Sequence, residues 1–253
     1  MFSNSVLLNE HEELLCCRDV FWEASTHGIN PHNVAMYQEN FETVDDLLSY
    51  LGTTSMYCVE KENKYINFPP IPVMEYFQSE SMIGEYFDGN EYQSIEFKPE
   101  LKDLAYLRTF KFEDLTFRGT IEFRSVCCQP ICDCMTVAAF HLGLQEKLHE
   151  LDELLQKDHV LYHHGYTASE LRQMFTYDKL PFFVKENELY ALAEQVVGLA
   201  EEGLAKRGKG EEIYLKPLYS RIKSRQNPAR QMLAARDRGV PLEDIIQSYS
   251  ELD

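Results

Sequence analysis

The stretch that most constrains the fold is residues 117 to 126, FRGTIEFRSV, because its side chains alternate in chemistry with a period of two. In an extended strand, alternate residues point to the same face. The polar face consists of Arg118, Thr120, Glu122 and Arg124, and the apolar face consists of Phe117, Ile121 and Phe123. Gly119 lies on the apolar side and leaves room for a neighbouring backbone or a bulge. The pattern therefore predicts an amphipathic strand.

The polar face of this strand has two interpretations. It can simply face water, as one side of an antiparallel sheet often does. Alternatively, Glu122 and Arg124 face a site that handles a metal and an anion. The backbone rise between alternate residues separates them by roughly 6 to 7 Å, which would let Glu122 bind a divalent cation and Arg124 reach a phosphate without neutralising each other.

Apolar periodicity predicts helices in four other segments. The two strongest are Val137 to Gln156 and Leu189 to Arg207, the second ending at Gly208, and we expect them to pack on each other or across the sheet. A shorter helix is expected from Val44 to Leu51, with Thr43 as N-cap and Gly52 as its end. The last begins at Pro228 with Asn227 as cap and ends near Arg238.

A hairpin is expected directly after the predicted helix Val44 to Leu51. Met56 to Val59 and Lys64 to Phe68 read as two short strands, ended by Pro69, Pro70 and Pro72. Aromatic residues at near-helical spacing then predict a helix from Met74 to about Asn90.

Composition excludes several classes of function. The 253 residues are 44% hydrophobic and carry a net charge of −18, which argues against nucleic-acid binding because a phosphate backbone needs positive surface. There is no long apolar run and no basic leader, so we expect no membrane association, a cytoplasmic location and reduced thiols. The length fits one large domain or two small ones, and we expect a single domain over residues 1–253.

Cysteines near the strand raise the question of zinc. Four of them precede His141, namely Cys127, Cys128, Cys132 and Cys134. Their spacing lacks the paired C-x2-4-C pattern of structural zinc sites, so buried or free thiols are the preferred interpretation. Standard nucleotide-binding loops and hydrolase elbows are absent from the sequence.

Several segments together resemble one family. The run GTIEFRSVCCQP at residues 119–130, followed by AAFHLGL at 138–144, resembles the Glu-x-Arg strand, proline and Ala/Phe-rich helix of the glutamate–cysteine ligases. Further similar segments follow the family's order, at residues 17–22, 56–66, 199–204, 214–218 and 227–229.

The resemblance implies an activity and three site residues. Enzymes of that family use ATP and Mg²⁺ to join the γ-carboxylate of glutamate to the amine of cysteine through a γ-glutamyl phosphate, the first step of glutathione synthesis. Glu122 falls on a metal-ligating glutamate, Arg124 on the arginine that contacts the transferred phosphate, and Arg18 on a position associated with the substrate carboxylate. The implied fold is mixed α+β, an antiparallel sheet that includes strand 117–126 with helices packed on its apolar face, as in the glutamine synthetase-like superfamily.

The resemblance covers only the C-terminal portion of the family's catalytic domain. One glutamate cannot hold a cluster of Mg²⁺ ions, so we expect a truncated or split ligase that is inactive alone and pairs as a homodimer or with a complementing N-terminal chain. Two alternatives stay open. One is an inactive remnant or an interaction module built on the helices at 137–156 and 189–207. The other is a carboxylate–amine ligase with a different acceptor amine.

Overall fold

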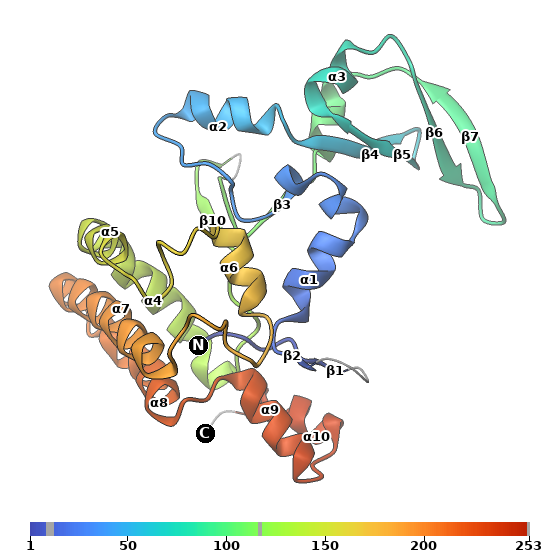
Figure 1. Ribbon diagram of the computed structural model, residues 1–253. Helices are drawn as coiled ribbons and strands as arrows, with labels where there is room; N and C mark the ends of the chain where they lie inside the picture. The colour runs from blue at the N-terminus through green and yellow to red at the C-terminus, as the bar shows by residue number, and fades with distance from the viewer. Residues whose placement is uncertain (9–12, 116–117, 252–253) are drawn as a thin grey trace. The chain divides into compact units, whose positions relative to one another are not determined.

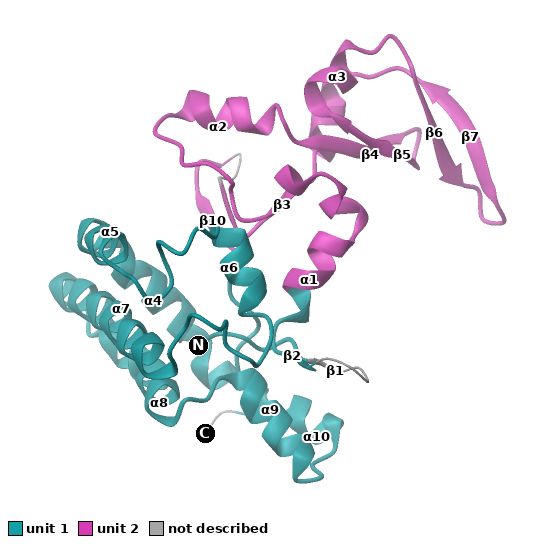
Figure 2. Cartoon of the chain, in the orientation of Figure 1, with its two compact units in different colours: residues 1–18, 125–253 teal, residues 19–124 magenta. Residues whose placement is uncertain are grey.

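The computed structural model describes residues 1–8, 13–115 and 118–251. Its contacts divide the chain into two compact units, residues 1–18 with 125–253 and residues 19–124 (Figure 2). The fold is mixed α+β, as the sequence predicts. The expectation that residues 1–253 form a single domain stays a prediction.

A four-stranded antiparallel sheet organises the unit of residues 19–124, in the order β4-β5-β6-β7 (Figure 1). Its strands are β4 (Ser55–Lys61), β5 (Lys64–Pro72), β6 (Met82–Phe87) and β7 (Tyr92–Phe97). Helix α3 (Val73–Gln78) follows β5 and helps to cover one face, where the core contains Met56, Val59, Ile66, Phe68, Val73, Tyr76 and Phe97.

Two expectations for this sheet are wrong. The hairpin is present, but β5 continues through the prolines to Pro72 instead of ending before them. The aromatic run after Met74 forms α3, β6 and the start of a turn rather than one helix. Gly84 explains the second difference, because a Cβ at that residue would lie 2.5 Å from a side-chain carbon of Ile66 and 2.8 Å from the carbonyl oxygen of Asn67. The glycine permits close approach of β5 rather than interrupting a helix.

The remaining elements of residues 19–124 are short. Helix α1 (Cys17–Ala24) starts in the other unit, and α2 (Val44–Leu51) has the predicted bounds, with Thr43 and Asp46 forming a reciprocal capping box. Strand β3 (Val34–Ala35) pairs in parallel with β8 (Phe110–Lys111), and β9 (Glu113–Leu115) pairs antiparallel with β10 (Ile121–Phe123).

The amphipathic strand is shorter than predicted. Of residues 117 to 126, Ile121–Phe123 form β10, and Phe117 lies outside the described residues. Within the described part of the chain β10 pairs with β9 and not with the four-stranded sheet. Ile121 and Phe123 are 63% and 45% exposed, so the expectation of helices packed on their face is wrong. A two-stranded ribbon of three residues per strand has too little apolar surface to hold a helix layer.

Helices dominate the other unit. They are α4 (Cys134–Gln145), α5 (Leu148–Gln156), α6 (Ala168–Met174), α7 (Glu186–Arg207), α8 (Lys216–Ser224), α9 (Pro228–Asp237) and α10 (Leu242–Ser248). A short ribbon of β1 (Leu7–Leu8) and β2 (Glu13–Leu14) precedes them. The core lies where α4, α7 and α8 meet, and it contains Ala139, Val197, Ala200, Leu204, Leu215, Leu218 and Ile222.

The two strongest predicted helices do pack on each other, as α4 and α7 (Figure 1). The first is broken, however: α4 ends at Gln145 and α5 begins at Leu148, because Lys147 leaves helical geometry at φ −128° and ψ 29°. The predicted end of α7 at Gly208 is confirmed, with φ 66° in the left-handed region. The predicted start of α9 is also confirmed, because the Asn227 side chain accepts from the N–H of Arg230.

Candidate functional site

The candidate site is one face of the β9–β10 hairpin. The register places Glu122 directly opposite Asp114. Directly opposed residues of an antiparallel pair point to the same face, so the two carboxylates are neighbours and repel each other unless a cation lies between them. Gly119 has φ +74°, in the left-handed region that favours glycine, and a Cβ there would meet none of the described residues within 4 Å. The expectation that a neighbouring backbone or a bulge comes close at Gly119 stays a prediction, because residues 116–117 lie outside the described part of the chain.

Arg124 supplies a cation for these two carboxylates. Its Nη2 lies 2.9 Å from Oε2 of Glu122, and its Nη1 lies 3.4 Å from Oδ2 of Asp114. The hydrogen bond from Arg124 holds the pKa of Glu122 below its usual value. The expectation that Glu122 and Arg124 stay apart without neutralising each other is wrong for this state of the protein. The long arginine side chain folds back along the strand, which the backbone rise alone does not reveal.

Asp114 is less exposed than Glu122 and accepts two hydrogen bonds besides its contact with Arg124. It accepts hydrogen bonds from the hydroxyls of Tyr37 and Thr109 at 3.2 and 3.1 Å. Its side chain is 14% exposed, whereas that of Glu122 is 49% exposed. Burial and the neighbouring Asp114 raise the pKa of Tyr37, so this hydroxyl remains a donor. The face therefore has one less exposed carboxylate, that of Asp114, and one more exposed carboxylate, that of Glu122, and both pair with Arg124.

A buried lysine lies behind this face. Lys111 is 1% exposed, and its Nζ donates to the carbonyls of Val34 and Met36 and to the hydroxyl of Tyr50, at 2.8, 3.0 and 2.8 Å. Burial lowers its pKa to about 8, against the opposing effect of Asp114. The Nζ also lies 5.3 Å from the ring centroid of Tyr37, and the hydroxyl of Tyr37 in turn donates to Asp114.

Of the three site residues predicted from the sequence, the structure brings two together. Glu122 and Arg124 form the ion pair on the hairpin. Arg18 belongs to the other unit, where its Nη1 donates to the carbonyl of Val126 at 2.9 Å.

Sequence reasoning missed Asp114, Tyr37 and Lys111. A signal for Asp114 was present: a turn at Gly119 between two alternating segments puts a residue near position 114 opposite Glu122. Tyr37 and Lys111 are brought together by the parallel pairing of β3 with β8. Each strand has only two residues, which is too short to give a recognisable sequence pattern.

The donor set partly fits a magnesium ion. Mg²⁺ binds through one or two carboxylates together with substrate phosphates and water, which Asp114 and Glu122 can satisfy. Among residues 1–8, 13–115 and 118–251, no group of three His, Cys, Asp or Glu side chains is placed to hold a metal. The hairpin therefore suits a single cation that obtains its other ligands from a bound phosphate and water rather than from further protein side chains.

No helix in the described part of the chain is both long and apolar enough to cross a membrane. No protein-family model matches this chain, and a search of curated proteins finds none similar to it.

Proposed function

We propose that this chain contributes the metal- and phosphate-binding face of an ATP-dependent ligase of the glutamate–cysteine type. Such an enzyme joins the γ-carboxylate of glutamate to the amine of cysteine through a γ-glutamyl phosphate, with ATP and Mg²⁺. The observation that supports it is the bridging of two directly opposed carboxylates by Arg124 on one face of a hairpin.

The roles follow from the chemistry of these groups. Carboxylate oxygens are ligands for Mg²⁺, so Glu122 and Asp114 would hold the cation that accompanies ATP. The forked donors of Arg124 match phosphate oxygens and would stabilise charge on the transferred phosphoryl group. Arg18 would bind the substrate carboxylate.

Energetics allow Arg124 to change partners. The ion pair between Glu122 and Arg124 is exposed to solvent, which screens the attraction, so the pair contributes little to stability. Breaking this ion pair so that the guanidinium can bind a phosphate therefore costs little. Mg²⁺ would then balance the negative charge of Glu122. The ion pair is a resting arrangement that a metal–nucleotide complex can displace.

The site on this hairpin is incomplete as a metal cluster, so we propose that the chain acts as a truncated or split ligase. Within the described residues the hairpin offers two carboxylates, and further ligands would come from a second chain, either another copy or a complementing N-terminal chain. The edge strands β4 and β7 of the four-stranded sheet are compatible with such pairing.

The acceptor amine remains a separate question. A ligase with a different acceptor amine would use the same hairpin chemistry, because the roles proposed for Glu122, Asp114 and Arg124 concern only the cation and the phosphate. The helical interaction module is less well supported: α4 and α7 use their facing sides to pack on each other, which leaves only their remaining sides for a partner.

Calorimetry with ATP and Mg²⁺ tests the proposed binding face. The unaltered chain should bind the nucleotide in a Mg²⁺-dependent way, and Glu122→Gln and Arg124→Met should each weaken that binding by tenfold or more, the loss of about one charge-assisted contact. Glu113→Gln is the matched control, because Glu113 lies opposite Phe123 on the other face of the same hairpin. Equal binding by all four proteins, or none by the unaltered chain, would count against the proposal.

Phosphate release tests whether the chain is sufficient. The isolated chain, mixed with ATP, Mg²⁺, glutamate and cysteine, should show no sustained turnover because its metal ligands are too few. Sustained release that depends on both amino acids would support the ligase chemistry and refute the split form.

A further inference from the structure

Two buried thiols face each other in the unit of residues 1–18 and 125–253. The Sγ atoms of Cys16 and Cys127 are 3.5 Å apart, and the residues are 5% and 6% exposed. They come from segments 111 residues apart in the sequence. The Oγ of Ser5 also lies 3.5 Å from Sγ of Cys127.

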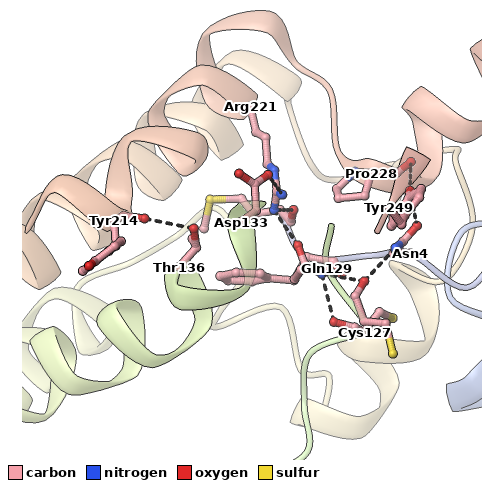
Figure 3. A network of polar contacts seen from close by, with 12 residues as sticks. Asn4, Cys127, Gln129, Asp133, Thr136, Tyr214, Arg221, Pro228 and Tyr249 are labelled. Atoms are coloured by element: carbon pink, nitrogen blue, oxygen red, sulfur yellow. Dashed lines mark hydrogen bonds and ion pairs between the residues drawn. The ribbon is translucent and has the colours of Figure 1, made fainter. Parts of the chain in front are cut away.

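The backbone around each thiol is fixed by hydrogen bonds. Figure 3 shows Gln129, whose Nε2 donates to the carbonyls of Cys127 and Cys128 at 2.9 and 3.1 Å. The same glutamine accepts from Nη1 of Arg221 at 2.7 Å. On the other side, the N–H of Cys16 donates to the carbonyl of Thr176 at 3.4 Å. These hydrogen bonds help to position the two backbone segments that carry the thiols.

The surroundings favour a thiolate at Cys127. The hydrogen bond from Cys16 lowers the pKa of Cys127, against the opposing effect of burial. Ser5, the backbone N–H of Asn4 and the charge of Arg18 act in the same direction as Cys16. A thiolate beside a second thiol has a resolving thiol next to the sulfur that a peroxide would oxidise.

We propose that Cys16 and Cys127 form a reversible disulfide when the chain meets a hydroperoxide. The Cys127 thiolate attacks one peroxide oxygen and breaks the O–O bond, which gives a sulfenic acid and releases the other oxygen as an alcohol or water after protonation. The Cys16 thiol then attacks the sulfenic sulfur, forms the S–S bond and releases water. Two thiols lose two electrons and the peroxide gains them, and a dithiol reductant afterwards reduces the disulfide to the two thiols while becoming a disulfide itself.

The proposed disulfide would also raise the stability of the folded protein relative to the unfolded chain. The chain leaves the helical unit after Arg18 and returns to it at Ser125. A bond between Cys16 and Cys127 would thus close a loop that contains all of residues 19–124. Closing a loop of this length reduces the entropy of the unfolded chain, so the oxidised protein should unfold at a higher temperature than the reduced protein.

A pair of two-cysteine variants tests the proposal in the full-length chain. The first keeps Cys16 and Cys127, the control keeps Cys17 and Cys128, and in each the other five of the seven cysteines become serine. Cys17 and Cys128 are the immediate neighbours, half-buried and exposed. Under limiting hydrogen peroxide the first variant should lose both free thiols as a monomer, regain them with dithiothreitol and melt at a higher temperature when oxidised. The control should not form an intramolecular bond.

Mass spectrometry of the unaltered chain provides the second measurement. Trypsin leaves Cys16 and Cys17 together on residues 1–18, and Cys127 with three other cysteines on residues 125–147. Fragmentation of the cross-linked pair should assign the bond to Cys16 and Cys127. A first variant that retains its thiols, a bond that joins two molecules, or a bond assigned to Cys17 or Cys128 in the unaltered chain would overturn the proposal.

Discussion

Arg124 determines the electrostatic state of the hairpin face. It lies between two carboxylates that the strand register sets directly opposite each other, and without it the pair would be repulsive. The three groups together keep one negative charge in excess, which favours a cation. A guanidinium also has the geometry to bind phosphate, so the same residue can serve the resting and the ligand-bound states.

Replacing Arg124 should change the titration of Glu122. In Arg124→Met the pKa of Glu122 should rise toward or above its ordinary value, because the hydrogen bond is lost and Asp114 is then uncompensated. Carbon-detected NMR of the carboxyl group measures this directly. The pKa of Glu150, which Lys147 holds low in another unit, should not move and serves as control. An unchanged Glu122 pKa would mean that the ion pair is not formed in solution.

Lys111 is a second residue with a measurable signature, in the pH dependence of stability. Burial lowers its pKa to about 8, whereas an unfolded lysine keeps its proton to about pH 10.4. Between those values the unfolded state binds more protons, so the free energy of unfolding should rise with pH, by at most about 1.4 kcal/mol per pH unit. Below pH 8 both states are protonated and the contribution is constant.

Urea denaturation from pH 8 to pH 10 compares this slope in the unaltered chain and in Lys111→Met. The variant should be less stable, because two carbonyls and the Tyr50 hydroxyl lose their donor, and its slope should be smaller. The upper limit avoids tyrosines such as Tyr37, whose raised pKa acts in the opposite direction above pH 10. Identical slopes would show that Lys111 does not titrate in this range.

At the scale of elements, the α4–α7 contact depends on two glycines. A Cβ on Gly143 would lie 2.2 Å from the carbonyl oxygen of Ala200, and one on Gly203 would lie 2.1 Å from the carbonyl oxygen of Gly143. Both obstacles are backbone atoms, which cannot move without shifting a helix. The two helices therefore approach more closely than any other residue type would allow at these positions.

Substitutions on α7 test this packing. Gly203→Ala should destabilise the protein by roughly 1–3 kcal/mol, because the backbone clash outweighs the better helix propensity of alanine. Gly198→Ala, on the same helix with nothing within 4 Å of its Cβ, should instead stabilise it by about 0.5–1 kcal/mol. Urea melts followed by circular dichroism give both values. Stabilisation by both variants would contradict the close contact.

Local signals in the sequence predict the elements that local interactions define. Thr43, Gly208 and Asn227 cap or end helices through contacts within a few residues, and those boundaries are confirmed. Contacts between distant segments decide the rest. The second part of the aromatic run after Met74 forms strand β6, where Gly84 allows the side chain of Ile66 on β5 to pack closely against the strand. No local sequence pattern predicts that contact. The candidate site follows the same division, since Glu122 and Arg124 are two residues apart in the sequence, whereas Asp114 comes from β9, the partner strand of β10.

At the scale of the whole molecule, the proposed ligase residues are divided between the two units. Glu122, Arg124 and the residues that support them belong to residues 19–124, and Arg18 belongs to the helical unit. The chain passes between the two units close in sequence to Cys16 and Cys127, so the proposed disulfide would close a loop that contains the hairpin residues. The net charge of −18 favours binding of ATP as a magnesium complex rather than as a free anion.

The central claim is that the β9–β10 hairpin binds a metal–nucleotide complex, and paramagnetic NMR tests it most directly. Mn²⁺ replaces Mg²⁺ at oxygen sites and broadens the signals of nearby nuclei. With ATP present, Mn²⁺ should broaden the amides of Glu113–Leu115 and Ile121–Arg124 first, and Arg124→Met should raise the concentration of the Mn²⁺–ATP complex needed for the effect by tenfold or more. Broadening centred on other residues, or unchanged hairpin signals at saturating Mn²⁺ and ATP, would contradict the account.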